Sequence, residues 1–94
     1  MILAIDYGTK KMGLALSDEK GIGISKLPIQ ELNSESHAIK IIEDLIKKNN
    51  ISLVILGLPL DDDGKKTTST QKVEDFGEKI RTRTEESIKY VDEY

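Results

Sequence analysis

The chain has no cysteine and no tryptophan among its 94 residues, and it has only one histidine and two prolines. Without cysteine there are no disulfides and no thiolate metal sites, and a cytosolic protein is favoured. The single histidine has no partner from which a Ser-His-Asp or Cys-His arrangement could be assembled. Three tyrosines and one phenylalanine are the only aromatic residues, so stacking of bases is a poor basis for nucleic-acid binding.

Long apolar segments are also missing. The longest one, residues 51–60, is interrupted by Ser52, Gly57 and Pro59 and is far too short to span a bilayer. Met1 leads directly into strand-like sequence, without the basic segment and cleavable apolar core of a signal peptide. We therefore expect a cytoplasmic protein with no membrane contact.

The charge balance gives no simple argument for a nucleic-acid partner. Seventeen acidic and fourteen basic residues give a formal net charge of −3, which weakens non-specific attraction to nucleic acid. If Asp6, Asp92 and Glu93 were buried or bound to a metal ion, the remaining charges would balance. The acidic excess therefore weakens a nucleic-acid hypothesis without excluding it.

Hydrophobic periodicity predicts one mixed α/β domain. Apolar runs predict five strands, at residues 1–6, 12–17, 24–29 (interrupted by Pro28), 51–56 and 88–91. Helical spacing of apolar residues predicts two helices, at residues 35–49 and about 69–83. The first two strands should form a hairpin and the later ones parallel βαβ units. We expect a mixed five-stranded sheet with helices on its faces.

Acidic residues end two of the predicted strands. Asp6 ends the first apolar run, and Asp92 and Glu93 end the last one. A carboxylate at the tip of a buried strand is costly unless it is paired or bound to a cation. In a parallel arrangement the two tips lie side by side, and strand alternation lets only one of Asp92 and Glu93 point toward Asp6. Converging oxygen ligands would hold Mg²⁺, and on the pattern alone a solvated chain end is equally open.

The turn after Asp6 contains residues that suit phosphate contacts. Gly8 would let the backbone approach whatever Asp6 holds. Lys10 and Lys11 could contact phosphates as point charges, or simply be solvated at a hairpin tip. A second basic and hydroxyl-rich stretch, residues 65–70, enters the second predicted helix. A helix N-terminus favours anions, but for this stretch a plain capping role is favoured.

A second turn is predicted after the strand at residues 51–56. Gly57 would bend the chain sharply off this strand, and Pro59 would stiffen a loop that forms a wall beside Asp6. The aspartates at 61–63 resemble a calcium loop only superficially, because no glutamate stands at the required later position. A solvated turn is the favoured interpretation of these aspartates.

Three motifs resemble those of the YqgF (RuvX-type) family. The stretch IDYGTKKMGLALSD, residues 5–18, is similar to the family's opening motif. The central motif is matched by Gly57-Leu58-Pro59-Leu60 with Gly64, Val73 and Phe76, and the start of the third motif by Asp92-Glu93. The resemblance implies a ribonuclease H-like fold, shared with RuvC resolvases. It also implies a cytoplasmic nuclease that processes the 5′ end of pre-16S rRNA in ribosome biogenesis, earlier proposed to be a Holliday-junction resolvase.

The resemblance also implies roles for particular residues. Asp6 and Glu93 would be the catalytic carboxylates and the ligands of Mg²⁺ or Mn²⁺, with water as the nucleophile. The phosphate- or nucleic-acid-binding loop would consist of Gly8, Thr9, Lys10 and Lys11. Lys11 stands where the family usually has arginine, which keeps the charge but loses the bidentate fork.

Family members continue through a further helix, strand and helix that supply a third aspartate. We therefore expect residues 1–94 to form a single ribonuclease H-like domain that is shortened at its C-terminus. Structured RNA and branched DNA both remain open as substrates, and the sequence is compatible with a homodimer. A non-catalytic RNA- or ribosome-binding member is the main alternative. A weaker one is an actin-like nucleotide-binding domain, which the segment Asp6-Tyr7-Gly8-Thr9 also resembles.

Overall fold

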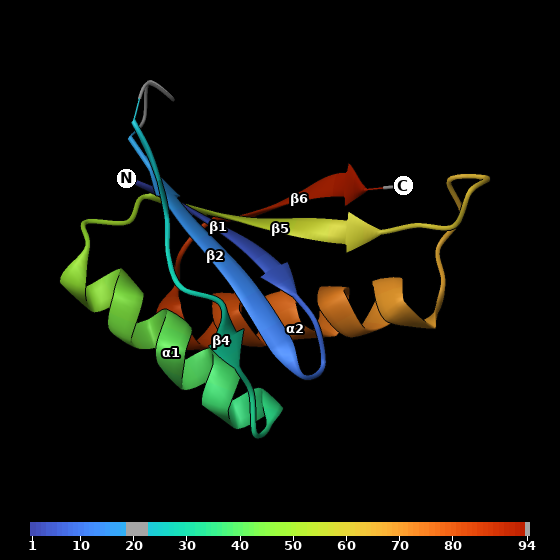
Figure 1. Cartoon of the computed structure of the whole chain (residues 1–94), viewed down its shortest axis with the longest axis horizontal. Helices are drawn as coiled ribbons and strands as arrows, with labels where there is room; N and C mark the ends of the chain where they lie inside the picture. The colour runs from blue at the N-terminus through green and yellow to red at the C-terminus, as the bar shows by residue number, and fades with distance from the viewer. Residues whose placement is uncertain (19–22, 94) are drawn as a thin grey trace.

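Six strands form one sheet in this computed structural model, which describes residues 1–18 and 23–93 (Figure 1). In chain order the strands are β1 (Ile2–Tyr7), β2 (Lys11–Ser17), β3 (Ile24–Lys26), β4 (Gln30–Glu31), β5 (Leu53–Pro59) and β6 (Ile88–Glu93). The helices are α1 (Glu35–Lys48), between β4 and β5, and α2 (Thr68–Thr84), between β5 and β6. The strand order is β3-β2-β1-β5-β6, with β4 paired to the start of β2. The predicted hairpin and the parallel β1-β5-β6 arrangement are both confirmed.

Two strands differ from the prediction. The expected third strand is divided into β3 and β4, with Pro28 between them, because proline cannot donate a hydrogen bond to the ladder. The predicted sharp bend at Gly57 is wrong, because β5 continues through Gly57 to Pro59. The pairing with β1 stops at Leu56, whereas β6 pairs with β5 as far as Pro59 and so extends it. At such an edge position the missing N–H of proline is tolerated.

Both helices cover the same face of the sheet (Figure 1). On β1, β2 and β5, the side chains of every second residue are buried and pack against the buried residues of α1 and α2. The strand members are Leu3, Ile5, Met12, Leu14, Leu16, Val54, Leu56 and Leu58, and the helix members are Ala38, Ile39, Ile42, Val73, Phe76 and Ile80. No helix of the described residues covers the opposite face of the sheet, which we name the open face.

The helix ends agree closely with the prediction, because each start has a capping side chain. The Ser34 hydroxyl accepts a hydrogen bond from the His37 N–H at the start of α1 (3.1 Å). Thr67 and Thr70 form a reciprocal capping box at the start of α2. The capping role favoured for residues 65–70 is thereby confirmed. Within the described chain, no helix combines the length and apolar character needed to cross a bilayer.

The helix α2 approaches the sheet most closely at Gly77. A Cβ atom at this position would meet the Tyr90 hydroxyl oxygen and would lie 2.8 Å from Leu56 Cδ1. The Tyr90 hydroxyl donates a hydrogen bond to the Glu74 carbonyl (3.3 Å), so its displacement would also disturb that bond. Glycine is therefore required here by close packing.

We predict that Gly77→Ala lowers the free energy of unfolding by about 1–2 kcal/mol, measured by urea denaturation. Overpacking costs typically about 1–3 kcal/mol, whereas the better helix propensity of alanine returns at most about 1 kcal/mol. The matched control is Gly23→Ala, where a Cβ would lie 3.6 Å from Asp18 Oδ2, an ordinary contact. Equal stability of the Gly77→Ala and Gly23→Ala proteins would contradict the close approach.

Candidate metal and nucleic-acid site

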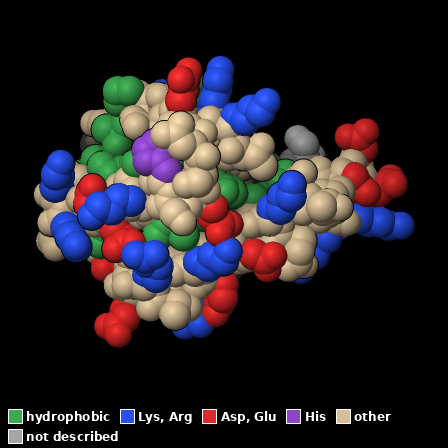
Figure 2. Space-filling model, turned by 90° about the horizontal axis from the view of Figure 1, so that it is seen from below, with side chains coloured by type: hydrophobic (Ala, Val, Ile, Leu, Met, Phe, Trp, Pro, Cys, Tyr) green, Lys and Arg blue, Asp and Glu red, His purple; other side chains and the backbone are tan. Residues whose placement is uncertain are grey.

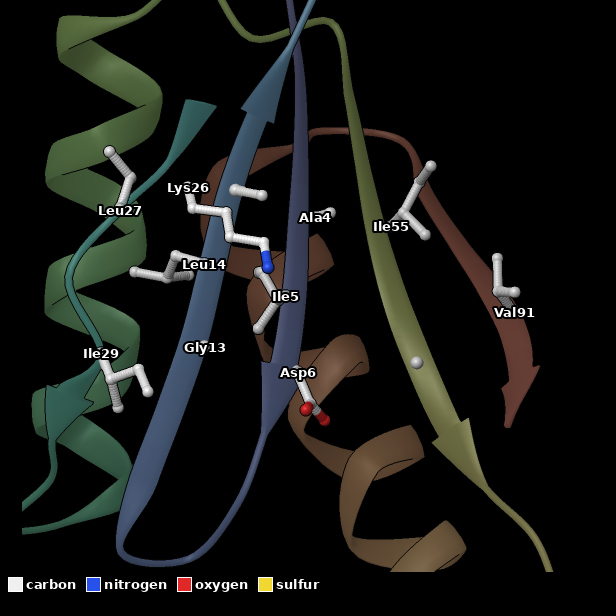
Figure 3. A pocket seen from close by; sticks show the side chains of 12 residues that line it. Ala4, Ile5, Asp6, Gly13, Leu14, Lys26, Leu27, Ile29, Ile55 and Val91 are labelled. Carbon is white, nitrogen blue, oxygen red and sulfur yellow. The ribbon is translucent and has the colours of Figure 1, made fainter. Parts of the chain in front are cut away.

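The open face of the sheet contains a groove of about 450 Å³ (Figure 3). Small residues make this face hollow, because alanine and glycine do not fill the space above the strands. They are Ala4 on β1, Gly13 and Ala15 on β2, and Gly57 on β5. Larger side chains form the sides: Lys26 of β3, Ile29 between β3 and β4, Ile55 of β5 and Val91 of β6. A groove on a sheet of this kind can accept an extended ligand.

Asp6 lies in this groove between two glycines (Figure 3). The register of the hairpin places Gly13 opposite Asp6, and Gly57 follows Leu56, the β5 partner of Ile5. Asp6 is exposed, and its carboxylate forms no hydrogen bond or ion pair with a described residue. Since both flanking positions lack a side chain, the carboxylate has room for a cation and a phosphate group beside it.

The orientation of Asp6 depends on its neighbour Tyr7. The Tyr7 ring stacks on the Phe76 ring of α2, with centroids 3.8 Å apart and planes 5° from parallel. Burial raises the pKa of the Tyr7 hydroxyl above its ordinary value, and the Glu35 carboxylate raises it further. Tyr7 therefore stays neutral on the helix side. Because successive strand residues face opposite sides, the Asp6 carboxylate must point to the open face.

Two acidic residues, Asp92 and Glu93, end β6. Val91 is opposite Gly57 and lines the groove, so strand alternation places Asp92 on the helix-covered side, away from Asp6. The backbone of Glu93 pairs with Pro59, while its side chain lies outside the described part of the structure. The pairing of Glu93 with Asp6 thus stays a prediction. Among the described residues, no three His, Cys, Asp or Glu side chains form a group that could hold a metal ion.

The donor chemistry at Asp6 nevertheless fits a hard divalent cation. The carboxylate offers oxygen ligands that are not used by any described partner, and oxygen ligands are those that Mg²⁺ prefers. Lys26 lines the same groove without forming an ion pair to Asp6. The aspartates at 61–63 form a turn instead, in which Asp61 Oδ1 accepts hydrogen bonds from the N–H groups of Asp63 (3.0 Å) and Lys65 (2.8 Å). The solvated turn favoured for these aspartates is confirmed.

The predicted phosphate loop is the tight connection between β1 and β2. The Gly8 N–H donates to the Lys11 carbonyl (2.9 Å), and a Cβ on Gly8 would lie 2.8 Å from that oxygen. Gly8, Thr9, Lys10 and Lys11 are all exposed. Neither lysine forms an ion pair with a described residue, and Lys11 lies opposite Glu31 in the β2–β4 register. Their contact with phosphate stays a prediction.

A second pocket, of about 270 Å³, lies beyond the tip of β1. It is lined by the loop residues Gly8 and Thr9 and by residues of α2, together with Tyr7 and Pro59. The two predicted wall residues therefore line different cavities: Gly57 lines the groove with Asp6, whereas Pro59 lines this pocket. Their functional role stays a prediction.

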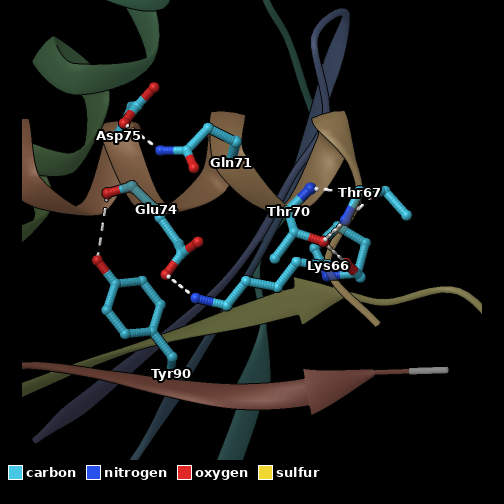
Figure 4. A network of polar contacts seen from close by, with 8 residues as sticks. Lys66, Thr67, Thr70, Gln71, Glu74, Asp75 and Tyr90 are labelled. Carbon is cyan, nitrogen blue, oxygen red and sulfur yellow. Dashed lines mark hydrogen bonds and ion pairs between the residues drawn. The ribbon is translucent and has the colours of Figure 1, made fainter. Parts of the chain in front are cut away.

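Thr70 joins the start of α2 to the end of β5 (Figure 4). Its side chain is fully buried, its hydroxyl donates to the Pro59 carbonyl, and the same oxygen accepts from the Thr67 N–H (2.9 Å). Nearby, the Lys66 ammonium pairs with the Glu74 carboxylate at 3.1 Å. These contacts fix the position of α2 relative to the tip of the sheet.

Several residues of the site were not singled out from the sequence. Gly13 carries a usable signal, because a glycine inside an apolar strand pattern often marks a close approach. Lys26 and Val91 carry none, since their positions follow from the register of the strands. Thr70 was predicted only as part of a capping stretch, and its contact with Pro59 follows from the crossing of α2 over the sheet.

Solved structures with a similar fold include RuvC, a viral Holliday junction resolvase and a phosphatase. RuvC of Thermus thermophilus aligns with a TM-score of 0.60 at 9% identity, over 97% of this chain and 63% of that chain. The fowlpox virus Holliday junction resolvase gives 0.53 at 18% identity, over 97% and 60%. The Aquifex aeolicus Ppx/GppA phosphatase gives 0.52 at 11% identity, over 97% and 35%. The protein therefore has the ribonuclease H-like fold that the sequence predicted.

The family follows from the sequence comparison. The model of the RuvX family, described as Holliday junction resolvase, matches residues 1–94, and the chain belongs to this family. A relative from Dictyoglomus turgidum, named a candidate pre-16S rRNA nuclease, is 38% identical over 92 residues, covering 98% of this chain and 65% of the relative. A relative of the same name from Maridesulfovibrio salexigens is 32% identical over 98% of this chain and 68% of its own length. The chain thus spans about two thirds of the length of these relatives.

We predict that Thr70→Val destabilises the protein by about 2–3 kcal/mol in urea denaturation. The substitution removes a buried hydroxyl that bonds both the Pro59 carbonyl and the Thr67 N–H, and a buried group left unsatisfied costs about 1–3 kcal/mol. Thr70→Ser keeps the hydroxyl and is expected to recover most of the loss. If valine and serine at position 70 gave the same stability, the proposed connection through the hydroxyl would be wrong.

Proposed function

We propose that the protein is a divalent-metal-dependent nuclease that hydrolyses phosphodiester bonds in the groove around Asp6. The observation that carries this proposal is the position of Asp6, an exposed carboxylate between Gly13 and Gly57 on the open face of a RuvX-family domain. Asp6 has no hydrogen-bond or ion-pair partner among the described residues, so its oxygens are available to a cation.

The residues around Asp6 have distinct proposed roles. Asp6 and Glu93 would hold Mg²⁺ or Mn²⁺ through hard oxygen ligands. A divalent ion bound there supplies Lewis-acid polarisation of a phosphate and activation of water for hydrolysis. Lys10 and Lys11, which lack ion-pair partners among the described residues, would hold phosphates of the substrate as point charges.

The distribution of charge supports binding at the open face and the β1–β2 loop. On the helix-covered side, basic and acidic side chains are interspersed and form no patch of one sign (Figure 2). Several basic residues on that side are used in ion pairs, such as Arg83 with Glu43 (2.9 Å) and Lys79 with Glu35. Such pairs leave little free positive charge for a phosphate backbone.

The proposed substrate is pre-16S rRNA, on the strength of the names of relatives that are 32–38% identical. The family resemblance favours its 5′ end as the position of cleavage. The family description favours branched DNA as a second candidate. A role in rRNA processing would place the protein in the cytoplasm. A homodimer stays a prediction.

We predict that Asp6→Asn lowers the rate of Mg²⁺-dependent cleavage at least about 100-fold. Replacing a residue that only supports a metal ligand already lowers metal affinity or activity about 10–100-fold, and loss of a ligand itself should have a larger effect. The measurement compares a labelled pre-16S rRNA fragment with a four-way DNA junction, with and without EDTA. Asp62→Asn, in the exposed turn, is the matched control and should cleave normally.

Three outcomes would count against the proposal. Cleavage that survives Asp6→Asn or EDTA would exclude the metal assignment. Binding of either substrate without cleavage by the unaltered protein would favour the non-catalytic alternative. ATP binding with neither activity would favour the actin-like alternative.

A further inference from the structure

Lys72 is unusual among the basic residues of α2. The helix contains four basic residues, and Lys72 alone forms no ion pair with a described residue. The other three are paired: Lys79 with Glu35, Arg81 with Glu78, and Arg83 with Glu43. Nearby carboxylates are also engaged elsewhere. Asp75, one turn further along, accepts a hydrogen bond from Gln71 Nε2 (2.9 Å), and Glu74 pairs with Lys66 (3.1 Å).

This unpaired lysine lines the pocket beyond the tip of β1. Two further lining residues, Thr9 and Ser69, offer hydroxyl groups, and no carboxylate of the described side chains lines the pocket. The volume of about 270 Å³ is close to the lower end of the range for small-molecule sites, about 300 Å³. A cation with two hydroxyl donors and no acid is a suitable environment for a phosphate group.

The walls of this pocket are held in place. Tyr7 is stacked on Phe76, and Thr70 binds the carbonyl of Pro59. Rigid walls reduce the entropic cost of holding a ligand. The pocket is therefore preformed between the β1–β2 loop, the end of β5 and the first turns of α2.

The pocket is also close to Asp6 along the chain. Thr9 is three residues beyond Asp6, and at about 3.4 Å per residue the two lie at most about 10 Å apart. One strand of a duplex advances about 3.4 Å per nucleotide along the helix axis, so this upper limit corresponds to at most about three nucleotides. A nucleic-acid strand leaving the groove around the β1–β2 loop would bring a neighbouring phosphate to the pocket.

We propose that Lys72, Thr9 and Ser69 form a phosphate subsite for the nucleic-acid strand whose scissile phosphate lies at Asp6. The subsite rests on the proposed nuclease function. Lys72 is a positioning residue: it neutralises a phosphate about one to three nucleotides from the reacting one and fixes the register of the strand. The hydroxyl groups of Thr9 and Ser69 donate hydrogen bonds to the same phosphate.

The test compares Lys72→Ala, Lys72→Arg and Lys47→Ala in two measurements. Lys47, in the last turn of α1, is exposed and lines neither the groove nor the pocket beyond β1. The first measurement is an NMR titration of the protein with inorganic phosphate at low ionic strength. Shifts of the Thr9 and Ser69 amides are expected for the wild type and Lys47→Ala, and should disappear in Lys72→Ala.

The second measurement is the salt dependence of binding to the labelled rRNA fragment and the four-way junction. Loss of one phosphate contact should reduce the slope of log K against log salt by about one and weaken binding about eightfold at about 0.1 M salt. Lys72→Arg should keep the wild-type slope, because the charge is retained. Lys47→Ala should also leave it unchanged.

The two measurements separate the subsite from the nuclease proposal. Phosphate shifts at Thr9 and Ser69 without any nucleic-acid binding would support the phosphate site and overturn the nuclease proposal. Absence of these shifts, or equal salt slopes for Lys72→Ala and Lys47→Ala, would overturn the subsite even if the protein cleaves nucleic acid.

Discussion

The position of the candidate site depends on the pairing of β1. This strand has the antiparallel β2 on one side and the parallel β5 on the other. Leu3, Ile5 and Tyr7 face the helices, so Asp6 must face the open side. A shift of the register by one residue would move the carboxylate into the core, where an unpaired charge is very costly. Burial of the helix-facing residues of β1 therefore also orients the proposed metal ligand.

The same pairing gives Asp6 its surroundings. Gly13 on β2 and Gly57 on β5 are brought to either side of it, and both lack a side chain. The result is a carboxylate that is accessible from the open face but held by a rigid strand. Rigid placement of a ligand on a strand gives better geometry than placement on a loop. This arrangement explains how a small domain with a net charge of −3 could still present a local site for phosphate chemistry.

Much of the fold could be predicted from local patterns, while the details of the site depended on tertiary pairing. Helical spacing and capping residues predicted α1 and α2 to within about a residue. Gly57 was misread as the end of a strand because β6 extends β5 beyond its contact with β1, which no local propensity reveals. The open face is not indicated by the sequence of β5, because Leu53 and Ile55 make its apolar run continuous, which is typical of a strand covered on both sides. Lys72 carried no signal, because its lack of an ion pair depends on where the other charges lie.

Line broadening of backbone amide signals by Mn²⁺ tests the central claim most directly, because it reports the location of the bound ion independently of activity. At substoichiometric Mn²⁺ we expect selective broadening of the signals of Asp6, Gly13, Gly57 and Val91, and loss of this effect in Asp6→Asn. Broadening centred on residues 61–63, with the groove signals unchanged, would contradict a metal site at Asp6.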